Sequence, residues 1–66
     1  MSDWKVLYRD DLDRDRMSWS IPSKEAALRR ARDLYFRDRA EIYRIVGPRG
    51  RTLPKEEIMR WMLGVR

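Results

Sequence analysis

The absence of cysteine and histidine constrains this chain of 66 residues more than any other feature of its sequence. Domains of this size bury only about 60% of the surface that their unfolded chains expose, and many add disulfides or a metal ion to compensate. Without cysteine no disulfide forms, and without cysteine and histidine the usual zinc sites are excluded. The chain must therefore fold by burying apolar side chains, and its length predicts one domain over residues 1–66.

The composition favours a folded protein that does not enter a membrane. Charged residues make up 41% of the chain, but both signs are present and seven aromatic residues lie among regularly spaced aliphatic ones. This differs from the composition of disordered chains, which combine low hydrophobicity with high net charge. The longest apolar runs have three residues, whereas a spanning helix needs about 20 and a signal peptide at least about 7. We therefore expect a cytoplasmic location.

Alternating apolar residues predict two strands in the first part of the chain. Within residues 4–9, the residues of one face are Trp4, Val6 and Tyr8. Residues 10–16 are charged except for Leu12 and have no periodicity, which predicts a solvated loop. A second alternating set is formed by Met17, Trp19 and Ile21. A strand, a loop and a strand in this order predict a hairpin with a long connection.

A helix is predicted from Ser23 to about Arg39. Pro22 ends the preceding strand, and the Ser23 hydroxyl is a suitable N-cap. The apolar residues that follow have helical spacing and form one stripe, which consists of Ala27, Leu28, Ala31, Leu34 and Tyr35. Phe36 points away from this stripe, because each residue turns the helix by about 100°.

Residues 40–46 are rich in β-branched and aromatic types and predict a third strand. Strict alternation places Ile42 and Val46 on one face and Tyr43 and Ile45 on the other. A strand with apolar side chains on both faces is typical of a central strand or of one covered on both sides.

A turn, a short strand and a second helix complete the predicted order. The residues Gly-Pro-Arg-Gly at 47–50 favour a turn, which leads into a strand over residues 51–53. Pro54 suits the first position of a helix, and Gly64 is placed to end it. The apolar residues of this helix cover most of its circumference and are Ile58, Met59, Trp61, Met62, Leu63 and Val65.

The resulting element order, ββαββα, predicts an α+β fold. We expect a three- to four-stranded, mostly antiparallel sheet in the order 2-1-3-4, with the first of two helices on one face. Two positions remain open for the C-terminal helix. It either covers the free face of the sheet, where Tyr43 and Ile45 need shelter, or lies beside the first helix.

Several short motifs together resemble short bacterial domains of unknown function. They are the Trp4-Lys5-Val6 strand, a second strand ending near Ser20, the helix start Ser23-Lys24-Glu25-Ala26-Ala27, and Ile42 leading to a glycine turn. The resemblance covers residues 4–53 and implies no catalytic residue.

The acidic residues do not form a recognisable metal site. Asp11, Asp13 and Asp15 have the spacing of the first three ligands in an EF-hand calcium loop. However, Arg16 stands where that loop requires glycine, and Pro22 stands where it requires a bidentate glutamate. We expect no metal at this loop.

The paired carboxylates do not predict an enzyme either. The pairs Asp10/Asp11 and Glu56/Glu57 are adjacent in sequence, and the sequence indicates for neither an apolar pocket of the kind that raises a carboxyl pKa for general-acid catalysis. Helix capping explains the glutamates without catalysis. We expect a protein that is not an enzyme and that has no cofactor.

The positive charge is concentrated in the middle of the chain. Residues 23–53 carry nine cations and four anions, a net charge of +5 that equals the net charge of the whole chain. Because arginine contacts phosphate bidentately, this segment suggests binding to a DNA or RNA backbone. The candidate contacts are Arg29, Arg30, Arg37, Arg39, Arg44, Arg49 and Arg51. A solvated face of ion pairs explains the same charges, and no helix-turn-helix, zinc finger or aromatic RNA-binding motif is present.

The C-terminal helix has more apolar residues than one stripe against one sheet requires. Methionine adapts to irregular surfaces and tryptophan is a frequent interface anchor, so this excess suggests a protein interface. The candidate interface residues are Phe36, Ile58, Met59, Trp61, Met62 and Leu63. Packing of the helix into the protein's own core explains the same residues.

Two functional hypotheses follow from the sequence. The leading one is a non-enzymatic interaction module that forms a homodimer or docks another protein through the C-terminal helix. The alternative is binding of a nucleic-acid backbone through the first helix and the 47–51 turn. The sequence defines neither the partner nor the biological role.

Overall fold

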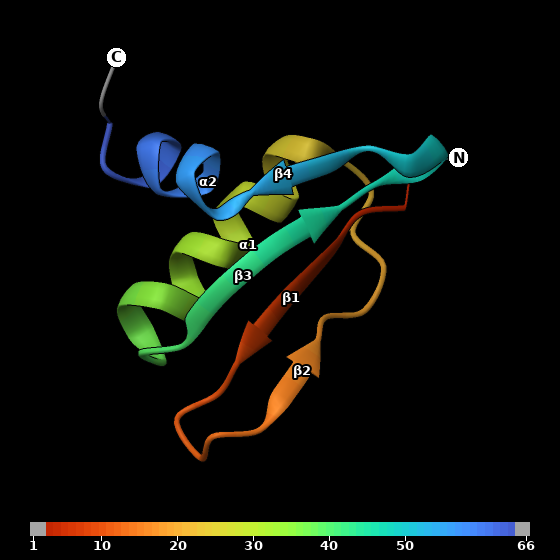
Figure 1. The fold of residues 1–66 in the computed structure, drawn as a ribbon. Helices are drawn as coiled ribbons and strands as arrows, with labels where there is room; N and C mark the ends of the chain where they lie inside the picture. Colours follow the sequence, from red (N-terminus) through yellow and green to blue (C-terminus); the bar gives the residue numbers. More distant parts are fainter. Residues whose placement is uncertain (1–2, 65–66) are drawn as a thin grey trace.

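Four antiparallel strands and two helices form the protein in a computed structural model, which describes residues 3–64. The strands are β1 (Lys5–Arg9), β2 (Asp15–Met17), β3 (Glu41–Val46) and β4 (Thr52–Pro54). The helices are α1 (Lys24–Arg37) and α2 (Lys55–Met62), and a 3-10 turn (Pro48–Gly50) joins β3 to β4. The strand order is β2-β1-β3-β4 (Figure 1), which confirms the predicted α+β fold and sheet order. Val65, predicted as part of the second helix, lies outside the described residues.

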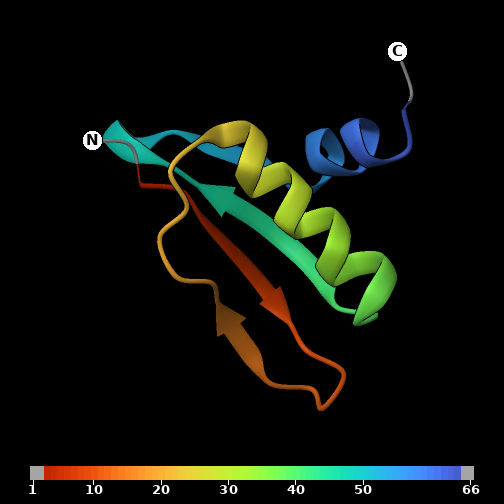
Figure 2. The same ribbon diagram turned by 180° about the vertical axis from the view of Figure 1, so that it is seen from behind.

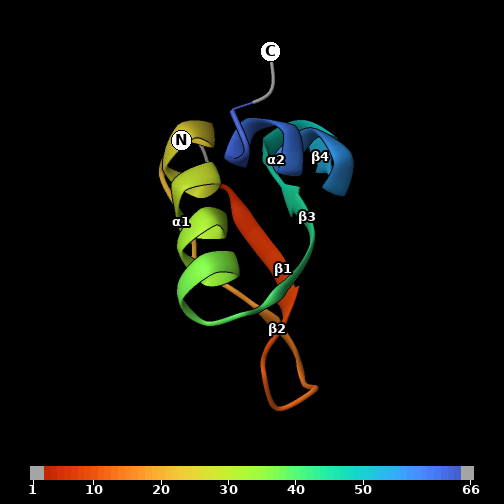
Figure 3. The ribbon, with the colours of Figure 1, turned by 90° about the vertical axis from the view of Figure 1, so that its left-hand side faces the viewer.

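Both helices lie on the same face of the sheet. α1 runs across β1 and β3, behind them in Figure 1 and in front of them in Figure 2. α2 contacts α1, β3 and β4, and Figure 3 shows it beside α1. Of the two positions predicted for the C-terminal helix, the structure therefore has the one beside the first helix. No helix from residues 3–64 covers the opposite face of the sheet.

One apolar core fills the space between the helices and the sheet. Its buried members are Trp4, Val6, Ile21, Ala27, Leu28, Ala31, Leu34, Ala40, Ile42, Ile45, Leu53 and Ile58. Within residues 3–64 no polar or charged residue is buried. Burial of apolar surface therefore holds the layers together, as the lack of cysteine and histidine requires.

Defined hydrogen bonds begin and end α1. The Ser23 hydroxyl accepts from the Ala26 amide at 3.1 Å, which confirms its role as N-cap. The predicted helix ran to about residue 39, but α1 ends at Arg37. Arg39 takes a left-handed conformation with φ 55, and the Ala40 amide donates to the Leu34 carbonyl at 3.0 Å. This left-handed residue ends the helix in the way that C-terminal caps usually do.

A β-bulge in β3 makes the predicted alternation of that strand wrong. Leu7 pairs with Arg44 but Tyr8 pairs with Ile42, so Tyr43 is an extra residue in the ladder. Because one residue is inserted, Ile42 and Ile45 both face the helices, and both are fully buried. Tyr43 lies on the helix-free face. Ile45, which the predicted alternation placed on that same face, is instead buried beneath the helices.

The second strand is shorter than its alternation predicts. β2 has three residues, all exposed, and of the predicted inward residues only Ile21 is buried. The Ser18 amide donates to the Val6 carbonyl at 2.9 Å, and the Ser18 hydroxyl accepts from the Val6 amide at 2.8 Å. The ladder resumes where Ile21 pairs with Trp4. The two residues between these pairings are pushed out of the ladder, so Trp19 projects into solvent.

α2 follows β4 directly. Pro54 ends β4 and is the N-cap of α2, whereas the sequence predicted it as the first helical residue. This tight connection turns α2 back onto the core, where Ile58 is fully buried. Neither helix within residues 3–64 has the length and apolar character needed to cross a membrane.

Close packing at Gly47 gives a test of the fold. A Cβ atom at this position would overlap the ring of Trp4, which belongs to the core. We expect Gly47→Ala to lower the free energy of unfolding by about 1–3 kcal/mol, because the ring has to shift in a packed core. Urea denaturation followed by circular dichroism measures the change. In the double variant Gly47→Ala/Trp4→Leu the clash disappears, so the two effects should be less than additive; full additivity contradicts this account.

Candidate nucleic-acid interface

A groove of about 820 Å³ lies between the β1–β2 hairpin and the C-terminal half of α1. α1 packs on β1 and β3, while the hairpin extends beyond it (Figures 2 and 3), so the two walls are separated. The charged lining residues are Arg14, Arg16, Arg30, Arg37, Arg39, Asp10, Asp11 and Asp38. Five arginines against three aspartates leave a net charge of +2. The groove is therefore an electropositive concavity.

α1 and the residues that end it supply three of the groove's arginines. Arg30, Leu34 and Arg37 follow one another at i, i+4 and i+7, so they share one side of the helix, with Leu34 buried between the two arginines. Arg39 follows Asp38 and is placed at the groove by its left-handed backbone. Among residues 3–64, none of these three arginines has an ion-pair partner.

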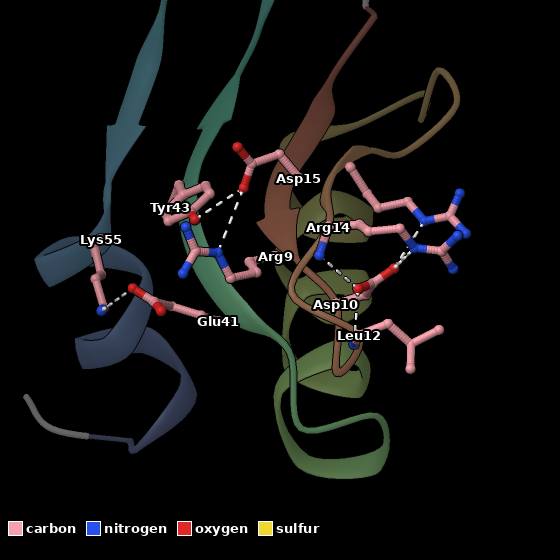
Figure 4. A network of polar contacts seen from close by, with 9 residues as sticks. Arg9, Asp10, Leu12, Arg14, Asp15, Glu41, Tyr43 and Lys55 are labelled. Carbon is pink, nitrogen blue, oxygen red and sulfur yellow. Dashed lines mark hydrogen bonds and ion pairs between the residues drawn. The ribbon is translucent and has the colours of Figure 1, made fainter.

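Asp10 stabilises the β1–β2 loop, which belongs to the groove wall opposite α1. One carboxylate oxygen accepts from the amides of Leu12 and Arg14, each at 2.9 Å. The other oxygen lies 3.1 Å from Nε of Arg16 and 3.4 Å from Nε of Arg14. Figure 4 shows this carboxylate at the centre of the loop. The predicted solvated loop is thus exposed but closed by an aspartate that mimics a backbone turn.

The environment of Asp10 favours its charged form. Its hydrogen bond from the Arg14 amide, followed by those from the Leu12 amide and the Arg16 guanidinium, holds the Asp10 pKa below its ordinary value of 3.8. Partial desolvation opposes this effect and is outweighed. The carboxylate is therefore ionised at neutral pH, and its charge is directed into its own loop.

A polar network on the helix-free face anchors β2 to the central strands. The Tyr43 hydroxyl donates to Asp15 at 3.0 Å, and Nε of Arg9 lies 3.6 Å from the same carboxylate (Figure 4). Desolvation and the bond to Asp15 raise the pKa of Tyr43 above 10.0, so the hydroxyl keeps its proton at neutral pH. β2 has three residues, and this network helps to fix the wall that it contributes to the groove.

The structure does not bring the seven candidate arginines of the sequence together. Arg30, Arg37 and Arg39 line the groove, whereas Arg29 pairs with Glu25 at 2.6 Å outside it. Arg44 lies on the helix-free face of β3, opposite Leu7. The other two candidates are Arg49, within the 48–50 turn, and Arg51, directly after it. This turn lies at the other end of the sheet from the β1–β2 loop (Figures 1 and 2).

Three of the groove residues that the sequence did not indicate bear directly on binding an anion or a ring. Arg14 and Arg16 lie in a run of alternating charges with no periodicity, and Trp19 fits the inward side of a regular strand. The side chain of Trp19 is 81% exposed and lines the groove. No sequence signal separates a regular strand from one interrupted after Ser18, because the interruption depends on pairing with Val6.

The candidate interface on α2 is divided between core and surface. Ile58 is fully buried, and Met62 packs partly against the core, so these two do not form an exposed face. Trp61 is 38% exposed, and the Arg32 guanidinium lies 5.6 Å from its ring centre. The remaining exposed members are Phe36 and Leu63, and Met59 is half-buried.

The acidic residues form no metal site in the part of the chain that the structure describes. Residues 3–64 contain no group of three or more potential ligands placed to hold an ion. Of the three EF-hand-like aspartates, Asp15 is bonded to Tyr43 on the helix-free face, while Asp11 lines the groove on the other side.

Comparisons with known proteins add no family to this description. No protein-family model matches the chain, and searches of curated proteins and of solved structures find no match. The resemblance to bacterial domains of unknown function stays a prediction. The function of the groove has to be argued from its own residues.

The lowered pKa of Asp10 gives a test of the hairpin wall. Because the folded-state pKa is below the unfolded one, the carboxylate stabilises the loop at neutral pH, and this contribution is lost as the pH falls through the folded-state value. The NMR shifts of the Leu12 and Arg14 amides should titrate with a midpoint below 3.8. In Asp10→Asn this step should vanish, since the amide oxygen still accepts hydrogen bonds but does not titrate. A midpoint at or above 3.8 contradicts the assignment.

Proposed function

We propose that this protein is a non-enzymatic binding module whose groove binds the sugar–phosphate backbone of nucleic acid. One observation carries the proposal: Arg30, Arg37 and Arg39 converge on a concave surface without ion-pair partners among residues 3–64. Guanidinium groups match phosphate oxygens bidentately, and each contact releases counterions from the nucleic acid.

The hairpin wall adds hydrogen-bond donors to the groove but little net charge. Arg14 and Arg16 already share the Asp10 carboxylate, so that wall is closer to neutral than its arginines suggest. An arginine has five donors, and one contact with Asp10 leaves others available for a ligand. An anionic strand in the groove would therefore contact three guanidinium groups on the α1 wall that have no ion-pair partner among residues 3–64. On the hairpin wall it would contact the guanidinium groups that also pair with Asp10.

This proposal predicts salt-dependent binding that depends on the groove arginines. Fluorescence anisotropy of a labelled single-stranded oligonucleotide at several KCl concentrations gives the affinity and its salt slope. The triple variant Arg30→Gln/Arg37→Gln/Arg39→Gln should bind roughly 10- to 100-fold more weakly, with the magnitude of its salt slope reduced by about 2.

A second triple variant provides the matched control. Arg29→Gln/Arg44→Gln/Arg49→Gln removes the same net charge outside the groove. It should retain most of the affinity, because its arginines do not line the concavity. An equal loss in both variants, or no binding by the unsubstituted protein at low salt, contradicts the proposal.

Self-association through α2 is the second candidate function. Its motivation is the exposed part of the candidate interface, which consists of Trp61 in α2, Leu63 at its C-terminal end and Phe36 in α1. We rank it second because the apolar area available for an interface is small. An aromatic side chain offers only roughly 150–250 Å² of surface for burial even when it is entirely exposed. Three partly covered side chains thus offer a few hundred Å² at most, whereas a stable interface buries about 800 Å² per partner.

Light scattering tests the second candidate. We expect a monomer at micromolar concentration, since the exposed apolar area is small. If a second copy does dock on α2, the unsubstituted protein should give the mass of a dimer, and Leu63→Ala should give that of a monomer. Circular dichroism verifies that the variant is folded.

A further inference from the structure

The backbone holds Trp19 outside the core. Ser18 makes two hydrogen bonds to Val6, one through its amide at 2.9 Å and one through its hydroxyl at 2.8 Å. Ile21 makes the next two, with the Trp4 amide and carbonyl at 2.9 and 2.8 Å. Between these fixed points, residues 19–20 do not pair with β1. The exposure of Trp19 thus follows from the strand pairing.

The three tryptophans have different environments. Trp4 is 5% exposed and belongs to the core, and Trp61 lies beneath the guanidinium of Arg32. Trp19 is 81% exposed, and among residues 3–64 no aromatic ring or guanidinium stacks on it. Keeping a large apolar side chain in water forgoes the stabilisation that its burial would give. Of the three indoles, Trp19 is therefore the one whose ring faces are available to a ligand.

Trp19 lies in the same groove as the unpaired arginines. It lines the concavity together with Met17 and Arg16 from the hairpin, opposite Arg30 and Arg37 from α1. Proteins that bind single-stranded nucleic acid combine these two elements: a basic groove that follows the backbone and an exposed aromatic ring on which a base stacks.

The indole distinguishes paired from unpaired strands. In a duplex the faces of the bases are covered by their neighbours, so an aromatic ring at the surface has no base face to contact. In an unpaired strand the faces are accessible, and stacking on them tolerates any sequence because every base has a π-face. Arginines alone attract both kinds of nucleic acid.

We infer that the groove selects unpaired RNA or DNA, with one base stacked on Trp19 and the adjacent phosphates held by Arg30, Arg37 and Arg39. This inference rests on the proposed function and specifies its ligand. The stacking supplies the preference for single strands, and the arginines supply the attraction common to all nucleic acids.

Substitution of Trp19 tests the inference. The probes are oligo-dT and oligo-rU of about 12 nucleotides, a duplex of the same length, and inorganic polyphosphate, which has no bases. Trp19→Ala should weaken binding to oligo-dT or oligo-rU by roughly 5- to 100-fold and leave the affinities for duplex and polyphosphate unchanged. Trp19→Phe should restore much of the loss. Phe36→Ala, which removes an exposed aromatic residue outside the groove, should change none of these affinities.

Fluorescence gives an independent readout of stacking. In a Trp61→Phe background, emission from the exposed Trp19 should be quenched when oligo-dT or oligo-rU binds, and acrylamide quenching should decrease because the ring becomes covered. The duplex and polyphosphate should produce neither change.

The outcomes separate the inference from the proposed function. If every probe binds equally and Trp19→Ala has no effect, the groove still binds polyanions but the inference is wrong. If no probe binds at low salt, the proposed function itself fails. If Trp19→Ala weakens binding only to oligo-dT and oligo-rU, and Trp19→Phe restores much of that binding, both the inference and the proposed function are supported.

Discussion

The packing of both helices on one face of the sheet is the interaction from which the other features follow. Without cysteine and histidine, the chain depends on apolar burial to hold it together, and its apolar residues are sufficient for one core. α1 covers the central strands, and α2 fills the space beside it over β3 and β4. Neither helix lies over the loop that joins β1 to β2 (Figure 3). The groove lies between this end of the hairpin and the C-terminal half of α1.

The groove is built at departures from regular structure. An extra residue at Tyr43 turns its hydroxyl toward Asp15 on the helix-free face. The interruption after Ser18 exposes Trp19, and the left-handed backbone of Arg39 ends α1 beside the groove. Bulges and unusual backbone conformations redirect side chains that a regular ladder or helix would place elsewhere, and they occur often near functional sites.

The distribution of charge pairs decides which surface is available to an anion. By total charge, the segment from residue 23 to residue 53 is the expected anion-binding part of the chain. Its arginines, however, lie on separate parts of the surface. Arg29 is paired with Glu25, whereas Arg30, one residue further along the helix, faces the groove without a partner among residues 3–64. Asp10 directs its charge into its own loop, which limits its effect on a ligand. Local pairing thus matters more for binding than the net charge of +5.

The sequence by itself determined the order of elements, the antiparallel sheet with β1 between β2 and β3, and the core residues of β1 and α1. These follow from local periodicity, capping at Ser23 and the crossover through a helix from the second strand to the third, which need no knowledge of distant partners. Only the tertiary structure decided that Ile45 faces the helices, that Trp19 faces solvent and that Arg14 and Arg16 join Arg30 at one groove. The physical reason is that a one-residue shift in strand register reverses every side chain after it, and that shift is set by hydrogen bonds to another strand.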